Sequence, residues 1–305
     1  MIHFLPEFSN NIYNRKFTAE VDVLASDELL LKGTMQDHRF ALQQTWELRT
    51  PTYEILAAAA QQHAGNPEKF APELCGRYAN LQGIKIGRGF TKQILQVLGD
   101  LPGVQEHLFL AMELARSSQQ VYQFPPEFEA KFAALPNESV SLAHNIWIKD
   151  RMFMDDLKNS CHSYRDESDL LFKERDIRCG FDPLVPRPQP GDKRIFWRSK
   201  RVMITKNVDE SFTCESAMED GVHDILIGFT LDKYGVISNA HSRGLRLPFQ
   251  GLCEDPQQRT TSLNGLRVTE NYVKEVAACV GGTTGCTHLF DLSMDCLRLV
   301  RFENC

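Results

Sequence analysis

The stretch Gly281-Gly282-Thr283-Thr284-Gly285-Cys286-Thr287-His288-Leu289-Phe290 decides how this chain is organised. It is a glycine-rich turn between two segments with helical spacing, and it places a thiol and an imidazole at the beginning of the second segment. A helix start offers free backbone N–H groups and the positive end of the helix dipole. A cysteine in that position has a lowered pKa, and its thiolate attacks electrophiles or binds metal ions. Cys286 and His288 are therefore the first candidate site residues.

An altered copy of this stretch lies in the first half of the chain, at Gly99-Asp100-Leu101-Pro102-Gly103-Val104-Gln105-Glu106-His107-Leu108-Phe109. Further pairs follow in the same order at offsets near 180: Met35-Gln36-Asp37 with Met218-Glu219-Asp220, His38 with His223, Cys75 with Cys253, 81–86 with 263–268, Phe90 with Tyr272, and His107 with His288. Two copies make a duplication rather than a repeat array. The sequence predicts an α+β fold in which two related antiparallel-sheet-plus-helix units pack with pseudo-twofold symmetry.

Alternation of apolar residues predicts strands in both halves, and helical spacing follows them. Strands are expected at 17–24, 28–35, 39–46, 195–204, 211–218, 224–231 and 236–241, and helices at 90–98, 107–120 and 270–280. Residues 52–62 fit either a helix or a strand. The domain division expected is a first, degenerate repeat at 1–124, a linker and connecting segment at 125–192, and a second repeat with the candidate site at 193–305.

Composition excludes several classes of protein. A hydrophobic content of 42% and a charged content of 24% are those of a globular chain, and a net charge of −6 argues against nucleic-acid binding. No apolar stretch is long enough to span a membrane, and the N-terminus lacks the features of a secretory signal. The nine cysteines include no Cys-x-x-Cys pair, so a reducing, cytoplasmic location is expected. No nucleotide-binding, P-loop, HExxH or GxSxG motif occurs, which disfavours a nucleotide cofactor.

The second repeat holds further residues that bind metals or transfer protons. Imidazole and thiolate groups are the ligands that zinc and iron prefer. The predicted metal ligands are His223, His241, Cys253, Cys286 and His288, of which Cys286, His288 and His223 are also the predicted catalytic residues. In the structural alternative, the glycines make an ordinary turn, the thiol is packed in the core, and His288 caps its own helix.

The first repeat and the intervening region supply two further hypotheses. The first repeat has no counterpart of Cys286, which favours a supporting role for it; the alternative is a second site in which Glu106 replaces the thiolate. Cys161 and His162 are adjacent and point apart, so they are interpreted as structural. Tyr164 and Arg165 are the predicted substrate-binding residues.

The order of these residues resembles a bacterial family of domains of unknown function whose hallmark is a Gly-Cys-Thr-His-Leu signature. The matching residues are His223, Pro248-Phe249, Cys253, Leu263, Gly265-Leu266, Gly281-Gly282 and Gly285-Cys286-Thr287-His288-Leu289. The resemblance covers about residues 195–300, and 15–120 in degraded form. A family member is usually a single copy, with a carboxylate at the position of His241. The resemblance implies accessory or catabolic enzymes of aromatic or terpenoid small molecules.

Together these observations predict an enzyme, of the metal-dependent hydrolase or lyase type, that acts on a small organic molecule. It would use a divalent transition metal (zinc or iron) or an activated Cys286. The alternative is a non-catalytic accessory protein that binds a small molecule or a metal. The expected partner is a small-molecule ligand, with neither nucleic acid nor membrane, and a homodimer is left open.

Overall fold

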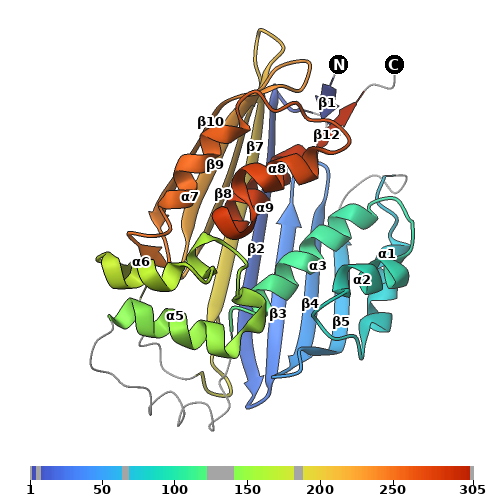
Figure 1. Cartoon of the computed structure of the whole chain (residues 1–305). Coiled ribbons are helices and arrows are strands. Elements are labelled where there is room, and N and C mark those ends of the chain that lie inside the picture. Colours follow the sequence, from blue (N-terminus) through green and yellow to red (C-terminus); the bar gives the residue numbers. More distant parts are fainter. Residues whose placement is uncertain (1, 5–7, 64–68, 122–140, 182–187, 303–305) are drawn as a thin grey trace. The chain divides into compact units, whose positions relative to one another are not determined.

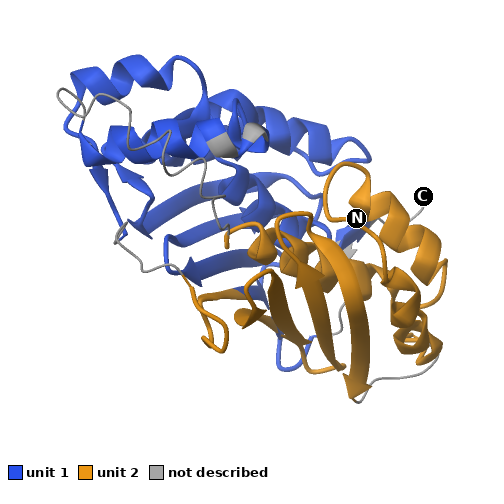
Figure 2. Cartoon of the chain, turned by 90° about the horizontal axis from the view of Figure 1, so that it is seen from below, with its two compact units in different colours: residues 1–14, 124–185, 201–305 blue, residues 15–123, 186–200 orange. Residues whose placement is uncertain are grey.

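The computed structural model describes residues 2–4, 8–63, 69–121, 141–181 and 188–302. Its contacts divide the chain into two compact units (Figure 2). Unit 1 contains residues 1–14, 124–185 and 201–305, and unit 2 contains residues 15–123 and 186–200. Of the linker and connecting segment predicted at 125–192, residues 125–140 and 182–187 lie outside the described residues. The described part of the intervening region, 141–181, belongs to unit 1.

Unit 2 is an antiparallel sheet with helices on one face (Figure 1). Along β3 and β4, buried residues alternate with more exposed ones, because successive side chains of a strand point to opposite faces. The helices pack their apolar stripes on the buried face, and the approach is close: a Cβ added to Gly33 on β3 would lie 2.9 Å from Leu114 of α3. The elements, in chain order, are β2 (Ile12–Ala25), β3 (Glu28–Gln36), β4 (Ala41–Arg49), β5 (Glu54–His63), α1 (Glu73–Gly76), η1 (Arg77–Leu81), α2 (Phe90–Leu98) and α3 (Val104–Ser118).

Unit 1 repeats this order of elements around its own core. Its helix α9 packs on strands β8 and β9, and α8 packs on α9 and η4 (Figure 1). The elements are β7 (Phe196–Lys206), β8 (Phe212–Asp220), β9 (Asp224–Leu231), β10 (Ile237–Arg246), α7 (Asp255–Gln258), η4 (Arg259–Leu263), α8 (Tyr272–Val280), η5 (Gly282–Thr284) and α9 (Thr287–Leu297). Strands β1 (Ile2–Phe4) and β12 (Val300–Phe302) form a separate two-stranded antiparallel sheet.

Unit 1 also contains a segment for which the described part of unit 2 has no counterpart. This intervening segment, residues 141–181, has its own apolar core around Trp147, Phe172 and Ile177, joined by Phe249 and Leu252. Ser141 caps its first helix by accepting a hydrogen bond from the backbone of His144. Its elements are α5 (Leu142–Phe153), η2 (Asp155–Leu157), η3 (His162–Tyr164), α6 (Ser168–Glu174) and β6 (Arg178–Cys179), which pairs with β11 (Phe249–Gln250).

The two units share details of backbone geometry as well as element order. In unit 2, Ile55 donates to the carbonyl of Ile84 and accepts from Gly83, at 2.9 and 2.8 Å. Ile237, Leu266 and Gly265 make the same two bonds in unit 1, both at 2.8 Å. The two glycines have φ of +84° and +86°, a conformation that favours glycine in both places.

The predicted α+β class is confirmed, with antiparallel strands followed by helices in each unit. The predicted strands and helices all occur, and their ends lie within five residues of those predicted. Residues 52–62, which fitted either a helix or a strand, contain β5. The pseudo-twofold packing stays a prediction.

Candidate functional site

A pocket in unit 1 gathers most of the residues that the sequence singled out. Its volume is about 60 Å³ and its surface is mainly apolar. The walls come from η3 of the intervening segment, from the starts of β9 and α9, and from the segment around α7. The lining residues are Cys161, Ser163, Tyr164, His223, Ile225, Leu247, Pro248, Cys253, Pro256, Gly285, Cys286 and His288.

The glycine-rich stretch forms one wall because its backbone is tightly folded. The N–H of Cys286 donates to the carbonyl of Val280 at 2.7 Å, which folds the stretch back onto the end of α8. A Cβ at Gly285 would overlap that same carbonyl oxygen, so only glycine fits there. Cys286 is then the N-cap residue of α9, and His288 lies in the first turn. Both side chains consequently line the pocket.

His223 is held in one orientation by Asp220. The Oδ1 atom of this buried carboxylate accepts hydrogen bonds from the backbone N–H groups of Val222 and His223, at 2.8 and 2.7 Å. The same oxygen lies 3.1 Å from Nδ1 of His223. Because an ionised carboxylate only accepts, the hydrogen-bond network places a proton on Nδ1 of the imidazole. The ring of His223 thus lies between the pocket and a buried carboxylate.

His288 lies against His223. The centroids of the two rings are 4.1 Å apart, with an angle of 47° between the ring planes. The rings come from elements far apart in sequence, the turn between β8 and β9 and the first turn of α9. Two imidazoles therefore meet at one polar corner of an otherwise apolar pocket.

The pocket thiols are protonated at neutral pH. Burial raises the pKa of Cys286 to about 12, despite hydrogen bonds from the backbone of Leu289 and His288 that lower it. Burial also raises the pKa of Cys253 and of Cys161. The expectation that the helix start lowers the pKa of Cys286 is therefore wrong, because removal of the thiol from water outweighs the local backbone N–H groups. In the described chain, the cysteines are all free.

Two of the predicted site residues do not line the pocket. His241 lies on β10 on an exposed side, with its ring over Gly228 and its Nδ1 atom 3.0 Å from the carbonyl of Asn239. Arg165 follows Tyr164 directly but does not contribute to the lining. Sequence reasoning missed Asp220, and it set aside Cys161, which lines the pocket although His162 points elsewhere. The Asp-x-x-His spacing at the end of a strand was the signal for Asp220.

The ligand set predicted for zinc or iron is only partly assembled. Three thiols and two imidazoles line the pocket, yet within the described ranges no three His, Cys, Asp or Glu side chains are arranged to hold a metal ion. The thiols carry protons, which a metal would have to displace. Thiol and imidazole groups suit a soft divalent or monovalent ion. These side chains would have to move closer together to bind one.

The corresponding place in unit 2 has different chemistry. Asp37 accepts backbone hydrogen bonds from Arg39 and Phe40, as Asp220 does from Val222 and His223. Phe40 thus occupies the position of His223 and stacks on Phe70 with ring centroids 4.2 Å apart. The sequence pairing of His38 with His223 is therefore wrong: His38 is an exposed residue inside the turn.

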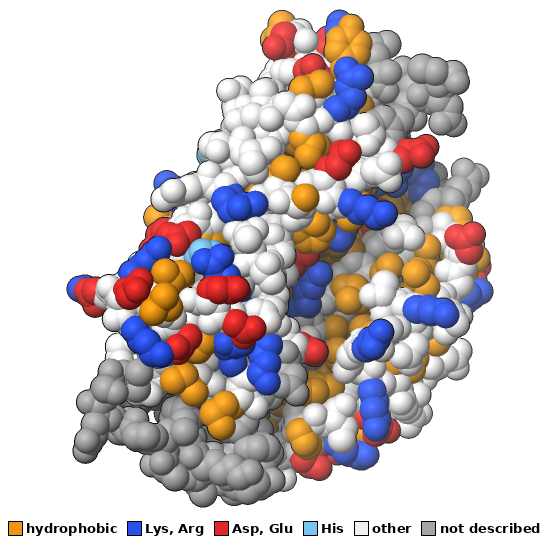
Figure 3. Space-filling view, viewed as in Figure 1, with side chains coloured by type: hydrophobic (Ala, Val, Ile, Leu, Met, Phe, Trp, Pro, Cys, Tyr) orange, Lys and Arg blue, Asp and Glu red, His pale blue; other side chains and the backbone are white. Residues whose placement is uncertain are grey.

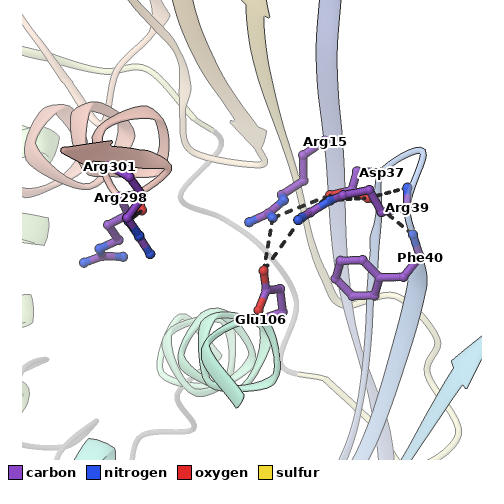
Figure 4. Close-up of polar contacts among 7 residues, drawn as sticks. All are labelled: Arg15, Asp37, Arg39, Phe40, Glu106, Arg298 and Arg301. Atoms are coloured by element: carbon purple, nitrogen blue, oxygen red, sulfur yellow. Dashed lines mark hydrogen bonds and ion pairs between the residues drawn. The ribbon is translucent and has the colours of Figure 1, made fainter. Parts of the chain in front are cut away.

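Glu106 takes part in an ion-pair cluster beside this turn (Figure 4). Its carboxylate lies 3.8 Å from Arg15 and 3.7 Å from Arg39, and Arg39 also binds Asp37 at 2.7 Å. When α3 is aligned with α9 so that Glu106 matches His288, the buried and exposed positions of the two helices agree better than when His107 matches His288. His107 then corresponds to Leu289, and both are fully buried. The sequence pairing of His107 with His288 is consequently off by one residue.

Residues 203–299 match a family described as "Protein of unknown function (DUF2889)". The matched range begins within β7, ends just after α9 and includes His223, Cys253, Cys286 and His288. It does not include the intervening segment or any of unit 2. No curated protein and no solved structure matched the chain.

In the parts of the chain that the structure describes, no helix is both long enough and apolar enough to cross a membrane. The helices in this part of unit 1 are short: α7, α8 and α9 have 4, 9 and 11 residues. Buried residues of α8 and α9 belong to the same apolar core as the strands of unit 1.

Proposed function

We propose that unit 1 is an enzyme that binds one end of a small, uncharged organic molecule in this pocket and transfers a proton to or from it. The observation that carries the proposal is the arrangement of Asp220, His223 and His288. A carboxylate fixes the tautomer of His223, and a second imidazole lies at 4.1 Å beside it. General acid–base catalysis by a positioned histidine contributes rate factors of about 10²–10⁴.

The size and lining of the pocket define the class of molecule. A cavity of about 60 Å³ is less than half the size of the ~150 Å³ apolar cavity that admits a benzene ring. The pocket therefore takes the end of an aromatic or terpenoid molecule, and the remainder extends outside. The apolar walls disfavour a charged end group, because its desolvation is not compensated by ion pairs.

In the proposed step, Nε2 of His223 takes a proton from the bound molecule. The resulting imidazolium is stabilised by Asp220, and the proton returns to the molecule or is exchanged with solvent. The protonated thiol of Cys286 serves as part of the wall and not as the nucleophile, since a pKa of about 12 leaves almost no thiolate at neutral pH.

Solvent-exchange measurements test this proposal. The probes are small cyclic ketones and phenols incubated with the full chain in D₂O, with deuterium incorporation followed by mass spectrometry. We expect exchange above background that falls at least tenfold in His223→Ala and in His288→Ala. His241→Ala, which changes an imidazole outside the pocket, is the matched control and should retain exchange. Binding without exchange would favour the non-catalytic alternative, and equal exchange by wild type and His223→Ala would overturn the proposal.

A second candidate function rests on a separate observation, the three thiols and two imidazoles around one pocket. Such donors favour zinc or iron, as the sequence suggested. Binding would release protons from the thiols and would need side-chain movements. Titration with cobalt(II), followed by thiolate charge-transfer absorption, tests it: absorption lost in a Cys253→Ser and Cys286→Ser double variant supports the site. Unchanged absorption in that variant excludes it.

We also propose that the chain arose by tandem duplication and that unit 2 is the degenerate copy. The matched order of elements and the paired hydrogen bonds at Ile55 and Ile237 support this. In unit 2 a stacked phenylalanine and an ion-pair cluster occupy the places of the two imidazoles. These replacements favour a structural, supporting role for unit 2. They disfavour the alternative, in which unit 2 has a second site with Glu106 as a ligand.

A further inference from the structure

We infer that the intervening segment is the specificity element of this pocket, and that Tyr164 is the residue that limits the size of the group admitted. This inference rests on the proposed function of unit 1, because it concerns the same pocket. It assigns a role to residues 141–181, which lie outside the family match at 203–299. The residues that select the ligand are therefore supplied by a part of the chain outside the matched domain.

The segment is bonded directly to the wall that carries the candidate catalytic groups. The N–H of His162 donates to the carbonyl of Gly285 at 2.8 Å, and the hydroxyl of Thr287 donates to the carbonyl of Ser160 at 3.1 Å. On the opposite wall, the hydroxyl of Ser163 lies 3.0 Å from the sulfur of Cys253. These contacts place residues 160–164 across one side of the pocket.

The same residues are held from behind by the core of the segment. The indole N–H of Trp147 donates to the carbonyl of Ser163 at 2.7 Å, and the hydroxyl of Ser168 donates to the carbonyl of His162 at 2.6 Å. Both acceptors are backbone groups of η3. The wall formed by η3 is consequently a fixed surface rather than a loose loop.

Tyr164 presents its ring to the pocket and its hydroxyl to the segment. The hydroxyl donates to Oδ2 of Asp150 at 2.7 Å, and the ring packs edge-on against Phe249 with centroids 5.7 Å apart. A tyrosine whose hydroxyl is already bonded offers only apolar surface to a ligand. Tyr164 therefore restricts volume without adding a polar contact.

The outer surface of the intervening segment carries mixed charged and apolar side chains, as is usual for a surface in contact with solvent. Figure 3 shows charged side chains of both signs mixed with apolar ones over α5 and α6. Ion pairs on this side include Arg151 with Asp166 and Lys173 with Asp169. The inner side, by contrast, supplies Cys161, Ser163 and Tyr164 to the pocket. The segment thus separates the pocket from solvent on this side.

Alkylation of Cys286 by reagents of different size tests the inference without a known substrate. The probes are iodoacetamide and the bulkier N-phenylmaleimide, applied at pH 9 because only the small thiolate fraction of Cys286 reacts. Labelling is quantified by peptide mass spectrometry on the full chain, as a rate for Cys286 relative to that of Cys279 with the same reagent. In wild type we expect iodoacetamide to label Cys286 in clear preference to the larger reagent. In Tyr164→Ala the rate with N-phenylmaleimide should rise at least tenfold. Cys279 of α8, which does not line the pocket, provides the internal reference and should be unchanged.

Further variants separate a size filter from unfolding of the segment. Tyr164→Phe keeps the ring and removes the hydroxyl that donates to Asp150, so it should label as wild type within about twofold. Tyr164→Leu keeps the segment packed and should give an intermediate rate. If Tyr164→Ala labels Cys286 as wild type does, the inference is overturned while the proton-transfer proposal stands. If labelling changes as predicted but deuterium exchange is absent, the proposed function fails and the role of Tyr164 in access is retained.

Discussion

Phe40 occupies in unit 2 the position that His223 occupies in unit 1. Each follows an aspartate by three residues, and each donates its backbone N–H to that aspartate. The two turns thus have the same hydrogen bonds, and the last side chain is an imidazole in unit 1 and a phenyl ring in unit 2. The backbone contribution of the aspartate is structural in both units. In unit 1 the aspartate also contacts the ring of His223.

The first prediction concerns His107, which is fully buried in unit 2. Burial lowers its pKa to about 4, and Nδ1 lies 3.1 Å from the hydroxyl of Tyr78. Because the folded pKa lies below the usual 6.5, the folded state resists protonation. Stability is complete above pH 6.5 and is lost as the pH falls towards 4. From pH 7 to pH 5 the loss should be about 2 kcal/mol.

The variant His107→Leu tests this, since Leu289 is the corresponding residue in unit 1. Urea unfolding at pH 7 and pH 5 should show a much smaller pH dependence in His107→Leu than in wild type. His38→Ala changes an exposed histidine and serves as the control, with wild-type behaviour expected. An equal loss at pH 5 in His107→Leu and wild type contradicts the prediction.

The second prediction follows from the protonated thiol of Cys286. Its folded pKa of about 12 lies above the usual 9.0, so this group stabilises the fold below pH 9, and that stability is lost as the pH rises towards 12. At pH 10 the loss should be about 1 kcal/mol. Chemical unfolding between pH 8 and pH 10 should be less pH-dependent in Cys286→Ser than in wild type. The same dependence in both proteins would show that the thiol is not enclosed.

Much of this architecture was predictable from the sequence. Alternating apolar residues predict most strands, and the spacing of Val276 and Val280 predicts α8. The pocket itself was less predictable, because its walls come from segments separated by more than a hundred residues. Tyr164 and Cys286, for example, are brought together by hydrogen bonds near Gly285 that no local pattern indicates. The pKa of Cys286 was missed for the same reason: tertiary burial outweighs the effect of the helix start.

The third prediction concerns Gly285, whose carbonyl accepts the hydrogen bond from His162. A methyl group at this position would overlap the carbonyl of Val280 and force the stretch before α9 to move. Gly285→Ala should therefore lower the free energy of unfolding by at least about 2 kcal/mol. Gly87→Ala provides a matched control, because no atom lies within 4 Å of an added Cβ there. Denaturant unfolding of the two variants measures the difference, and equal stabilities would contradict the close approach.

The last prediction compares the two aspartates that begin the equivalent turns. Asp220→Asn retains the shape of the side chain and an oxygen for the backbone N–H groups. It removes the charge that fixes the proton on Nδ1 of His223 and stabilises the imidazolium. Deuterium exchange into the ketone and phenol probes should therefore fall at least tenfold, with probe binding changed by less than about threefold. Asp37→Asn is the matched control. It disturbs the ion pair with Arg39 and should lower stability, yet it should leave exchange at the wild-type level because Phe40 cannot accept a proton. If both variants lose exchange in proportion to their loss of stability, the carboxylate of Asp220 acts through the fold alone and His223 is not the base.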